Sequence, residues 1–290
     1  MLNNINLISK SWPDYELLDS GDNRKLERYG KFVLARPETQ AIWRPAKPGL
    51  WKDVDAEFIR TEGKGAWKKK RDTPDTWNLS WGDVRFSARL TSFLHTGVFP
   101  EQAANWEWLS SRTKTGFGQS PRILNLFSYT GIASLVAAKN GAQVTHVDAS
   151  RQTNIWAKEN AELSGLAPTA IRFLDDDALK FAEREVRRGA TYDGIILDPP
   201  AFGRGTKGEV WKIEENLPRL LEALKKLLSP RSDSFFLLNG YAAGYSPLSF
   251  AQAVESYFKD MKGEFGELRL QGSKSDRSIP SGIYVRFVRG

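Results

Sequence analysis

From about residue 120 to the end of the chain, short apolar segments alternate with longer amphipathic segments. The apolar segments are RILNLF (122–127), QVTHVD (143–148), AIRFL (170–174), YDGIILD (192–198), SFFLLNG (234–240), GELRLQG (266–272) and GIYVRFV (282–288). Segments with helical spacing, such as 150–165 and 214–228, separate most of them. This alternation predicts an α/β fold, with a doubly wound, mostly parallel, seven-stranded Rossmann-like sheet. Because such sheets bind ligands outside the carboxyl ends of their strands, functional side chains are expected directly after each strand.

The part of the chain before this pattern has a different composition. Residues 14–90 contain short strand-like segments separated by turn residues, with a Gly-Asp hairpin signal at 82–83. We therefore predict two domains, a small β-rich domain over 1–85 and the α/β domain over 86–290. The basic run WKKKR at 67–71 makes the β-rich domain a candidate for contact with RNA.

Composition excludes several kinds of chemistry. The chain has no cysteine, and its two histidines, His95 and His146, lie far apart in the sequence, so no metal site is expected. No apolar run is long enough to span a membrane, and the N-terminus has no secretory pattern, so we expect a cytoplasmic protein. The net charge of +7 and the pI of about 9.4 fit either a polyanionic partner or a solvated basic surface.

The ends of the first two strands indicate a nucleoside-containing cofactor. Asp148 ends the second strand, about 20 residues after the first turn, where a carboxylate can accept hydrogen bonds from a ribose diol; capping of the next helix is the alternative. The first turn, FSYTG, contains only one glycine, Gly131, whereas a dinucleotide site needs a glycine-rich turn beside the pyrophosphate. This argues against a dehydrogenase. S-adenosylmethionine contains an adenosine without phosphates, and it fits such a turn.

The ends of the third and fourth strands suggest contacts to adenine and to a substrate. Asp177 follows the third strand, where it can accept from the adenine amino group or cap a helix. The fourth strand ends in the rigid corner of Asp198, Pro199 and Pro200. We interpret this corner as holding the methyl acceptor, with Phe202 stacking on a planar substrate; a strand-ending turn with a surface loop is the alternative. Two basic side chains after the corner can meet phosphates: Arg204 and Lys207.

Together these motifs resemble a known family. The stretches LNLFSYTG, VDAS, DDALKF and ILDPPAF, with HTGVFPEQAANW upstream, resemble the class I S-adenosylmethionine-dependent methyltransferases. Within that class, residues 85–290 are similar to bacterial 23S ribosomal RNA methyltransferases that modify cytosine C5 or guanine N7. The stretch DYELLDSGDNRKLERYGKFVLARPETQAIW also resembles the β-rich domain that precedes the catalytic domain in these relatives.

The resemblance implies a role for individual residues. It places Asp198, Pro199, Pro200 and Phe202 at the transferred methyl group, with Arg204 and Lys207 on the substrate. It assigns these residues to the cofactor: His95, Thr96, Gln102, Asn125, Phe127, Ser128, Tyr129, Thr130, Gly131, Asp148, Ala149, Asp176 and Asp177.

Three departures from the family pattern refine the expected function. The relatives have a lysine where this chain has His95, and an arginine where it has Ala103. The cytosine-C5 members carry a cysteine after the fifth strand, whereas this chain has none, so covalent attack on cytosine C6 is not expected. We expect a methyltransferase that acts by direct displacement on a base nitrogen in RNA, with ribosomal RNA as the expected substrate. The alternatives are methylation of a small aromatic metabolite or a protein side chain, or a non-catalytic RNA-binding or cofactor-sensing module.

Overall fold

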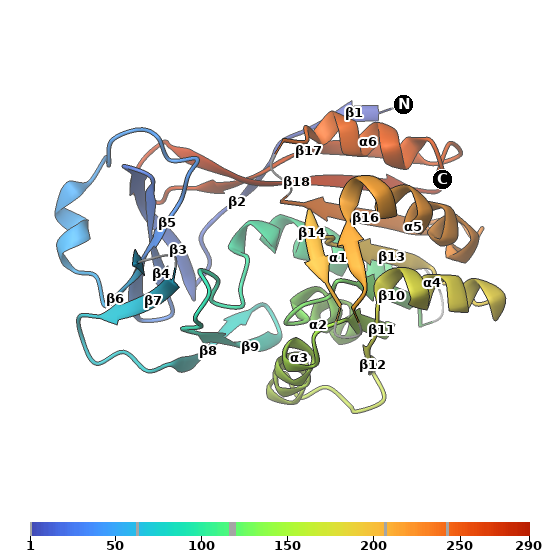
Figure 1. Ribbon diagram of the computed structural model, residues 1–290, viewed down its shortest axis with the longest axis horizontal. Coiled ribbons are helices and arrows are strands. Elements are labelled where there is room, and N and C mark those ends of the chain that lie inside the picture. The colour runs from blue at the N-terminus through green and yellow to red at the C-terminus, as the bar shows by residue number, and fades with distance from the viewer. Residues whose placement is uncertain (1, 62–63, 116–119, 206–207, 242–243) are drawn as a thin grey trace. The chain divides into compact units, whose positions relative to one another are not determined.

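The computed structural model describes residues 2–61, 64–115, 120–205, 208–241 and 244–290 (Figure 1). Two compact units can be distinguished. The sheet unit comprises Met1–Asn6, Asn105–Glu267 and Gly282–Gly290, and the β-rich unit comprises Leu7–Ala104 and Leu268–Ser281. The predicted boundary between residues 85 and 86 falls inside the range Leu7–Ala104, and it stays a prediction.

The α/β fold is confirmed, and all seven predicted strands are present. They are β10 (Arg122–Leu126), β11 (Gln143–Asp148), β12 (Ile171–Asp175), β13 (Gly194–Leu197), β16 (Phe235–Gly240), β17 (Lys262–Gln271) and β18 (Ser278–Val288). Their order in the sheet is β17-β18-β16-β13-β10-β11-β12. The pairs β13–β16, β10–β13, β10–β11 and β11–β12 are parallel, whereas β16–β18 is antiparallel.

The sheet has nine strands rather than the seven that we predicted. Two short segments near the N-terminus, β1 (Leu2–Asn4) and β2 (Leu7–Ser9), both pair in parallel with β17. Each has three residues, which is too short to show an alternating pattern in the sequence.

Helices pack on both faces of the sheet, as the alternation predicts. On one face α4 (Ala178–Arg187), α5 (Ile213–Leu227) and α6 (Pro247–Glu255) enclose a core with the apolar side chains of the strands. On the opposite face lie α1 (Ala103–Thr115) and α2 (Ile132–Lys139), where Trp108 contacts Phe235 and Asn125 bonds to Ser134. The next helix, α3 (Arg151–Leu163), begins at Ser150, whose hydroxyl accepts from the backbone N–H of Thr153.

The central strand β13 shows why the sequence forms this sheet. All four of its residues are buried, as is usual for a parallel strand covered on both faces. A Cβ at Gly194 would lie 2.3 Å from the ring of Phe235 on β16, so only glycine permits this close packing. The strand ends at Leu197, and the chain leaves the sheet at Asp198.

The β-rich unit contains a five-stranded sheet and a separate hairpin. The sheet has the order β3-β4-β5-β6-β7 and the hairpin pairs β8 with β9. These strands are β3 (Tyr15–Gly21), β4 (Arg24–Tyr29), β5 (Phe32–Pro37), β6 (Ala56–Thr61), β7 (Lys64–Lys69), β8 (Thr76–Trp81) and β9 (Val84–Arg89). The predicted hairpin turn is present at Gly82-Asp83, where the φ of Gly82 is 52°. Two 3-10 turns complete the unit, η1 (Pro48–Lys52) and η2 (Pro100–Gln102).

A buried ion pair lies in the interior of the β-rich unit. Arg36 and Glu27 lie 2.7 Å apart with almost no exposed surface. The hydroxyls of Tyr15 and Tyr29 donate to the same Glu27 carboxylate, so the buried charge is fully hydrogen-bonded.

Among the residues that the structure describes, no helix is both long and apolar enough to cross a membrane.

Candidate functional site

The carboxyl ends of the parallel strands bring most of the predicted site residues to one edge of the sheet. Phe127 follows β10, Asp148 ends β11, and Asp198 follows β13. Because β10 pairs with both β11 and β13, these three positions lie at the ends of neighbouring strands. The backbone N–H of Asp198 contacts the carbonyl of Leu126, which continues the pairing of the two strands to their ends.

The turn between β10 and α2 has an unusual backbone. Phe127, Tyr129 and Gly131 have φ values of 55°, 49° and 84°, all in the left-handed region. For the two aromatic residues this conformation costs about 1 kcal/mol or more each, and it persists only where the surroundings enforce it. Gly131 is also sterically required, because a Cβ there would lie 3.0 Å from Ala157 and 3.2 Å from His146. Such strain is typical of ligand-binding turns.

Asp148 is held by the turn and by the helix that follows it. Its Oδ2 accepts from the N–H of Tyr129 at 2.9 Å, and its Oδ1 accepts from the N–H of Ser150 at 2.9 Å and from the hydroxyl of Thr153 at 3.0 Å. A carboxylate has about four acceptor positions, so these bonds orient the group and leave capacity on Oδ2. Burial raises the pKa of the Asp148 carboxyl above its usual value, and the two N–H groups oppose that rise. Burial together with this carboxylate raises the pKa of Tyr129 to about 12.

Three of the predicted cofactor residues have structural partners in the turn. The hydroxyl of Ser128 donates to the carbonyls of Asn125 and Val147, which ties β10 to β11. The carbonyl of Thr130 accepts from the side chain of Asn160 at 3.0 Å. These bonds shape the backbone of the turn, and direct contact of Asn125, Ser128 and Thr130 with a cofactor stays a prediction.

A buried polar network beneath the turn was not predicted from the sequence. The Nδ2 of Asn125 donates to Ser134 at 2.9 Å, and the Ser134 hydroxyl lies 3.0 Å from Nδ1 of His146. Burial lowers the pKa of His146 to about 3, so the imidazole is neutral. The Ser134 oxygen accepts from Asn125, and which of the Ser134 hydroxyl and Nδ1 donates to the other depends on the tautomer of the imidazole. A lone histidine in an apolar strand carries no signal of such a network.

The acids after β12 have partners of their own. The Oδ1 of Asp177 accepts from the N–H of Lys180 at 2.9 Å and caps α4, which is the helix-capping alternative that the sequence left open. Asp176 forms an ion pair with Arg184. Both acids are half-buried, as is Ala149 after β11, and their contact with adenine or ribose stays a prediction.

The proline corner leads into a small hairpin. Pro199 is buried and Pro200 is exposed, and the Pro200 carbonyl accepts from the indole Nε1 of Trp211 at 2.7 Å. The hairpin pairs β14 (Phe202–Arg204) with β15 (Val210–Lys212). Phe202 is 55% exposed, so its ring is available to a planar ligand. Arg204 is exposed on the same strand, whereas Lys207 lies outside the described residues.

A second polar network, also missed by the sequence analysis, reaches the strand next to Asp198. Arg286 donates to Oδ1 of Asn105, and Nδ2 of Asn105 donates to Oδ1 of Asn239 at 2.7 Å. Because arginine has only donors, the orientation of both amides follows from these bonds. Asn239 lies on β16, beside the end of β13.

Three predicted cofactor residues belong to the β-rich unit. His95 is exposed and its ring packs on Phe99 with a centroid distance of 4.8 Å, while Thr96 and Gln102 are buried. The carbonyl of Leu94, next to His95, accepts from the buried Arg36. The contact of His95, Thr96 and Gln102 with the cofactor stays a prediction.

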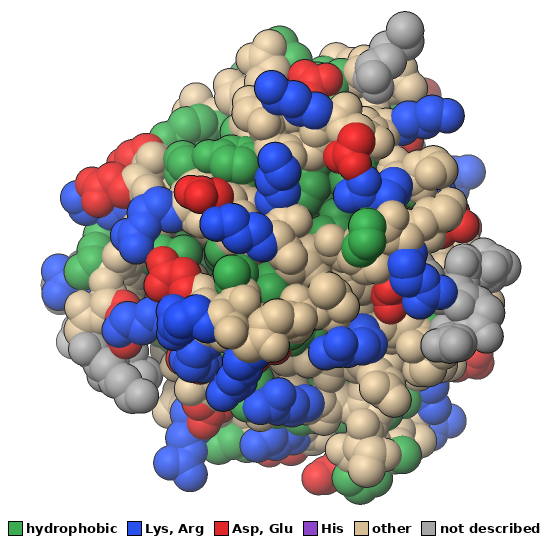
Figure 2. Space-filling view, turned by 90° about the vertical axis from the view of Figure 1, so that its right-hand side faces the viewer, with side chains coloured by type: hydrophobic (Ala, Val, Ile, Leu, Met, Phe, Trp, Pro, Cys, Tyr) green, Lys and Arg blue, Asp and Glu red, His purple; other side chains and the backbone are tan. Residues whose placement is uncertain are grey.

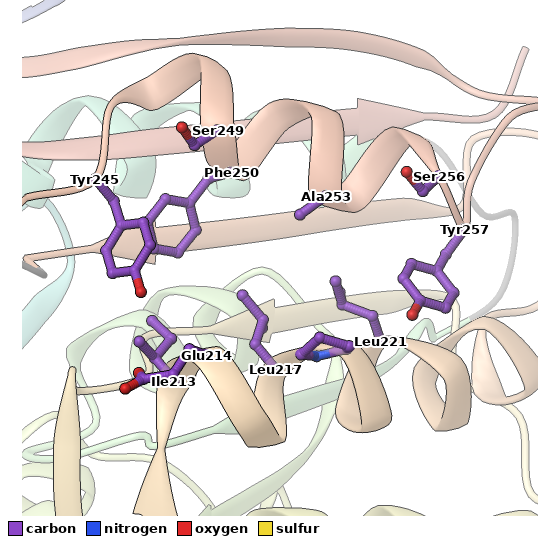
Figure 3. A pocket seen from close by; sticks show the side chains of 11 residues that line it. Ile213, Glu214, Leu217, Leu221, Tyr245, Ser249, Phe250, Ala253, Ser256 and Tyr257 are labelled. Carbon is purple, nitrogen blue, oxygen red and sulfur yellow. The ribbon is translucent and has the colours of Figure 1, made fainter.

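An apolar groove of about 350 Å³ lies between α5 and α6 (Figure 3). The two helices contribute its walls, with Leu217 and Leu221 on α5 opposite Phe250 and Ala253 on α6, and Tyr245 at one end. None of the predicted site residues lines this groove. Within the described ranges, no group of three His, Asp or Glu side chains could hold a metal ion.

The geometry of the strand ends fits an adenosine cofactor without phosphates. The turn has a left-handed backbone fixed by packing at Gly131, and Asp148 offers an oriented carboxylate beside it. It has no glycine-rich stretch for a pyrophosphate. The donors and acceptors present therefore suit S-adenosylmethionine better than a dinucleotide.

Comparisons with known proteins agree with this chemistry. A family model described as S-adenosylmethionine-dependent methyltransferase matches residues 52–257. The crystal structure of the SAM-dependent methyltransferase from Agrobacterium tumefaciens is 41% identical in sequence, with a TM-score of 0.95 over 99% of this chain and 95% of that chain. The structure of the methyltransferase SMU.776 complexed with SAH is 22% identical, with a TM-score of 0.74 over 95% of this chain and 76% of that one. The latter likeness shows the fold alone.

Curated relatives match part of the chain. The Ribosomal RNA large subunit methyltransferase K/L of Shewanella sp. (strain MR-4) is 36% identical over 159 residues, which are 54% of this chain and 22% of that protein. The protein of the same name from Shewanella frigidimarina (strain NCIMB 400) is 34% identical over 158 residues, 54% of this chain and 21% of its own length. The chain thus spans about a fifth of the length of the curated relatives that it matches.

Proposed function

The chain belongs to the S-adenosylmethionine-dependent methyltransferases, and from that premise we propose that it methylates a base nitrogen in ribosomal RNA. Two observations support this substrate. The curated relatives are named as large-subunit ribosomal RNA methyltransferases. The chain also carries a net charge of +7, and Lys and Arg side chains gather in the lower part of the face drawn in Figure 2.

The cofactor would lie on the turn after β10. S-adenosylmethionine supplies a methyl group on a sulfonium centre, from which it is displaced by a nucleophile. We propose that Asp148 holds the ribose through the remaining acceptor capacity of Oδ2, and that Asp177 meets the adenine. The methionine carboxylate would lie beside the turn over residues 127–131, in which the N–H groups of Ser128, Tyr129 and Gly131 donate within the protein and fix the backbone. Phe127 and Tyr129 would line the methionine side, where aromatic faces favour a cation.

The acceptor base would lie at the proline corner. The side chain of Asp198 would orient the nucleophilic nitrogen or receive its proton, and the fixed prolines would keep that carboxylate in place. The exposed ring of Phe202 would stack on the base, and Arg204 would contact a neighbouring phosphate. Since the sulfide that leaves is neutral, the contribution of these residues is positioning and local polarity.

The absence of cysteine from all 290 residues favours one of two kinds of base chemistry. Methylation of cytosine C5 requires a covalent bond from a thiolate to C6, and this chain has no thiol. A ring or exocyclic nitrogen carries its own lone pair and needs no covalent enzyme intermediate. A nitrogen acceptor is therefore the reaction that the available side chains support.

We propose that residues 1–85 help to hold the RNA and that residues 86–290 carry the transfer. In the run 67–71, Lys68 is exposed on β7. Lys69 and Lys70 are also exposed, although they form ion pairs with Asp75 and Glu57. Such surface pairs are weak enough to be exchanged for phosphates. We further propose that the protein acts in the cytoplasm, where ribosomal RNA is found.

A small aromatic metabolite or a protein side chain is the alternative substrate. The groove in Figure 3 is lined by neither Asp198, Asp148 nor Phe202, so it is not itself a substrate site at the proposed methyl centre. The observation that carries the RNA proposal is the exposed Phe202 and Arg204 directly after the Asp198 corner.

Nucleoside mapping tests this proposal. Ribosomal RNA from a strain lacking the gene and from its parent would be digested and compared by mass spectrometry. We expect one methylated nucleoside to disappear and to return when the wild-type gene is supplied, but not with Asp198→Ala. Identical profiles in the deletion strain and its parent would overturn the assignment to ribosomal RNA.

A further inference from the structure

Trp211 contacts both parts of the candidate site. It lies in the middle of β15 and is 6% exposed. Its indole Nε1 donates to the carbonyl of Pro200 at 2.7 Å, on the acceptor side. Its ring packs edge-on against Phe127, with a centroid distance of 4.8 Å and an interplanar angle of 63°, on the side of the turn. One side chain therefore links the strand end of β10 to the corner after β13.

Trp211 is the buried side chain of the hairpin that contacts the candidate site. Of the three residues in β15, Trp211 points inward, whereas Val210 and Lys212 are exposed. Both hairpin strands have only three residues, and an isolated ladder of that length is not stable in water. Contacts of Trp211 link the hairpin to the rest of the unit, as does an ion pair of 2.8 Å between Glu209 in the hairpin loop and Lys180 on α4. The bond of 3.0 Å from the N–H of Ile213 to the carbonyl of Ala201 closes the base of the hairpin itself.

The two contacts of Trp211 differ in kind, and this makes them separable. The bond to Pro200 uses the indole N–H, which can only donate. The contact with Phe127 uses the aromatic face and edge, and a phenylalanine ring can preserve much of it. Phe127 has a left-handed backbone, so the position of its ring depends on the backbone conformation of the turn. A ligand that alters the turn will alter the ring against which Trp211 packs.

We propose that Trp211 is a positioning residue that couples the cofactor turn to the acceptor corner. Binding of S-adenosylmethionine or its product at the turn orders Phe127, which fixes Trp211, the carbonyl of Pro200 and the strand that carries Phe202. The acceptor base then meets a preformed corner and binds more tightly. This inference rests on the proposed function, because it assumes a base at Phe202. It adds a binding order, cofactor before RNA, and the residue that imposes it.

Hydrogen exchange tests the first half of the coupling without RNA. Peptides covering Phe202–Arg204 and Val210–Lys212 would be followed with and without saturating S-adenosylhomocysteine. In the wild type we expect ligand to slow exchange in the hairpin as well as in the turn. In Trp211→Phe we expect slowing in the turn only. Slowing of the hairpin to the same degree in the variant would overturn the proposal, as would no slowing in the wild type.

RNA affinity tests the second half. The dissociation constant for unmodified large-subunit ribosomal RNA would be measured with and without S-adenosylhomocysteine. We expect the ligand to tighten RNA binding at least about 5-fold in the wild type and less than about 2-fold in Trp211→Phe, since coupling between sites is usually of this size. An equal ratio in both proteins overturns the inference and leaves the proposed function intact. Failure of the wild type to bind the RNA at all overturns the RNA assignment, and the exchange experiment then decides the coupling.

Two further variants guard against a merely structural effect. Phe127→Leu removes the ring that Trp211 contacts. In the double variant, its effect on the ratio of the RNA dissociation constants without and with S-adenosylhomocysteine should not add to that of Trp211→Phe. Trp43→Phe removes an indole bond of the same type, from Trp43 to the carbonyl of Ser20 at 3.0 Å, within the β-rich unit. It should leave the ratio unchanged. Additive effects, or an equal loss in Trp43→Phe, would contradict the proposal.

Discussion

The backbone N–H of Tyr129 donates a hydrogen bond of 2.9 Å to Oδ2 of Asp148 and so joins the turn after β10 to the end of β11. This bond holds a half-buried carboxylate next to a strained turn. It supports the proposed contact of Asp148 with the ribose, under which the affinity for the cofactor would depend on this one side chain.

Asp148→Ala should weaken S-adenosylmethionine binding by about 1–3 kcal/mol, because it removes an acceptor and leaves the N–H of Tyr129 unpaired. Titration calorimetry measures this directly. Asp193→Ala is a matched control, since Asp193 accepts from the N–H of Arg122 at the opposite ends of the strands. It should leave the affinity unchanged. Equal affinity in Asp148→Ala and the wild type would remove the ribose assignment.

RNA that contains 5-fluorocytosine should form no covalent adduct with this protein. That analogue traps enzymes that attack cytosine C6 with a thiolate, and the chain has no cysteine. A denaturing gel after incubation with S-adenosylmethionine gives the answer. A stable protein–RNA band would show that another nucleophile attacks the base, and the nitrogen acceptor would have to be abandoned.

Changing Lys68, Lys69 and Lys70 to alanine should reduce the salt dependence of RNA binding. Each lost phosphate contact lowers the slope of log affinity against log salt by about 0.7–0.9. Lys69 and Lys70 are ion-paired in the free protein, so they need not contact phosphates in the complex. The slope should therefore fall by the amount expected for about one to three lost phosphate contacts. Removing Arg219, Lys225 and Lys226 from α5 controls for net charge. If both triple variants change the slope equally, the run 67–71 has no special role.

The buried His146 should make stability fall in mild acid. Its pKa of about 3 in the folded chain lies below the value of about 6.5 expected after unfolding. The unfolded state therefore binds a proton first, and stability is lost as the pH drops from about 6.5 towards 3. Between pH 7 and 5, the free energy of unfolding measured with urea should fall by about 2 kcal/mol more in the wild type than in His146→Gln. An equal loss in both proteins would show that His146 is not held neutral by burial.

Much of the fold follows from the sequence because the seven main strands are apolar and separated by periodic helices. The strands missed, β1, β2, β14 and β15, have three residues each, and their pairing partners determine them more than their own pattern does. For the same reason the hairpin after the proline corner was interpreted as a loop.

The site could be predicted in part. The rule that ligands bind at the carboxyl ends of parallel strands leads to Asp148 and Asp198. It gives no information on partners distant in sequence, such as Trp211 with Phe127, because these depend on the path of the hairpin. The positive φ values of Phe127 and Tyr129 were equally invisible, since neither residue type favours them.

Asp198→Ala tests most directly the claim that the proline corner serves the methyl acceptor. S-adenosylmethionine affinity would be measured by calorimetry, and transfer of radiolabelled methyl groups would be followed to ribosomal RNA from a strain lacking the gene. We predict that affinity stays within a few fold while transfer falls by about 100-fold or more, the usual effect of losing one well-placed polar group. Loss of cofactor affinity and transfer together would contradict the account, because Asp198 would then be a cofactor ligand or a structural residue.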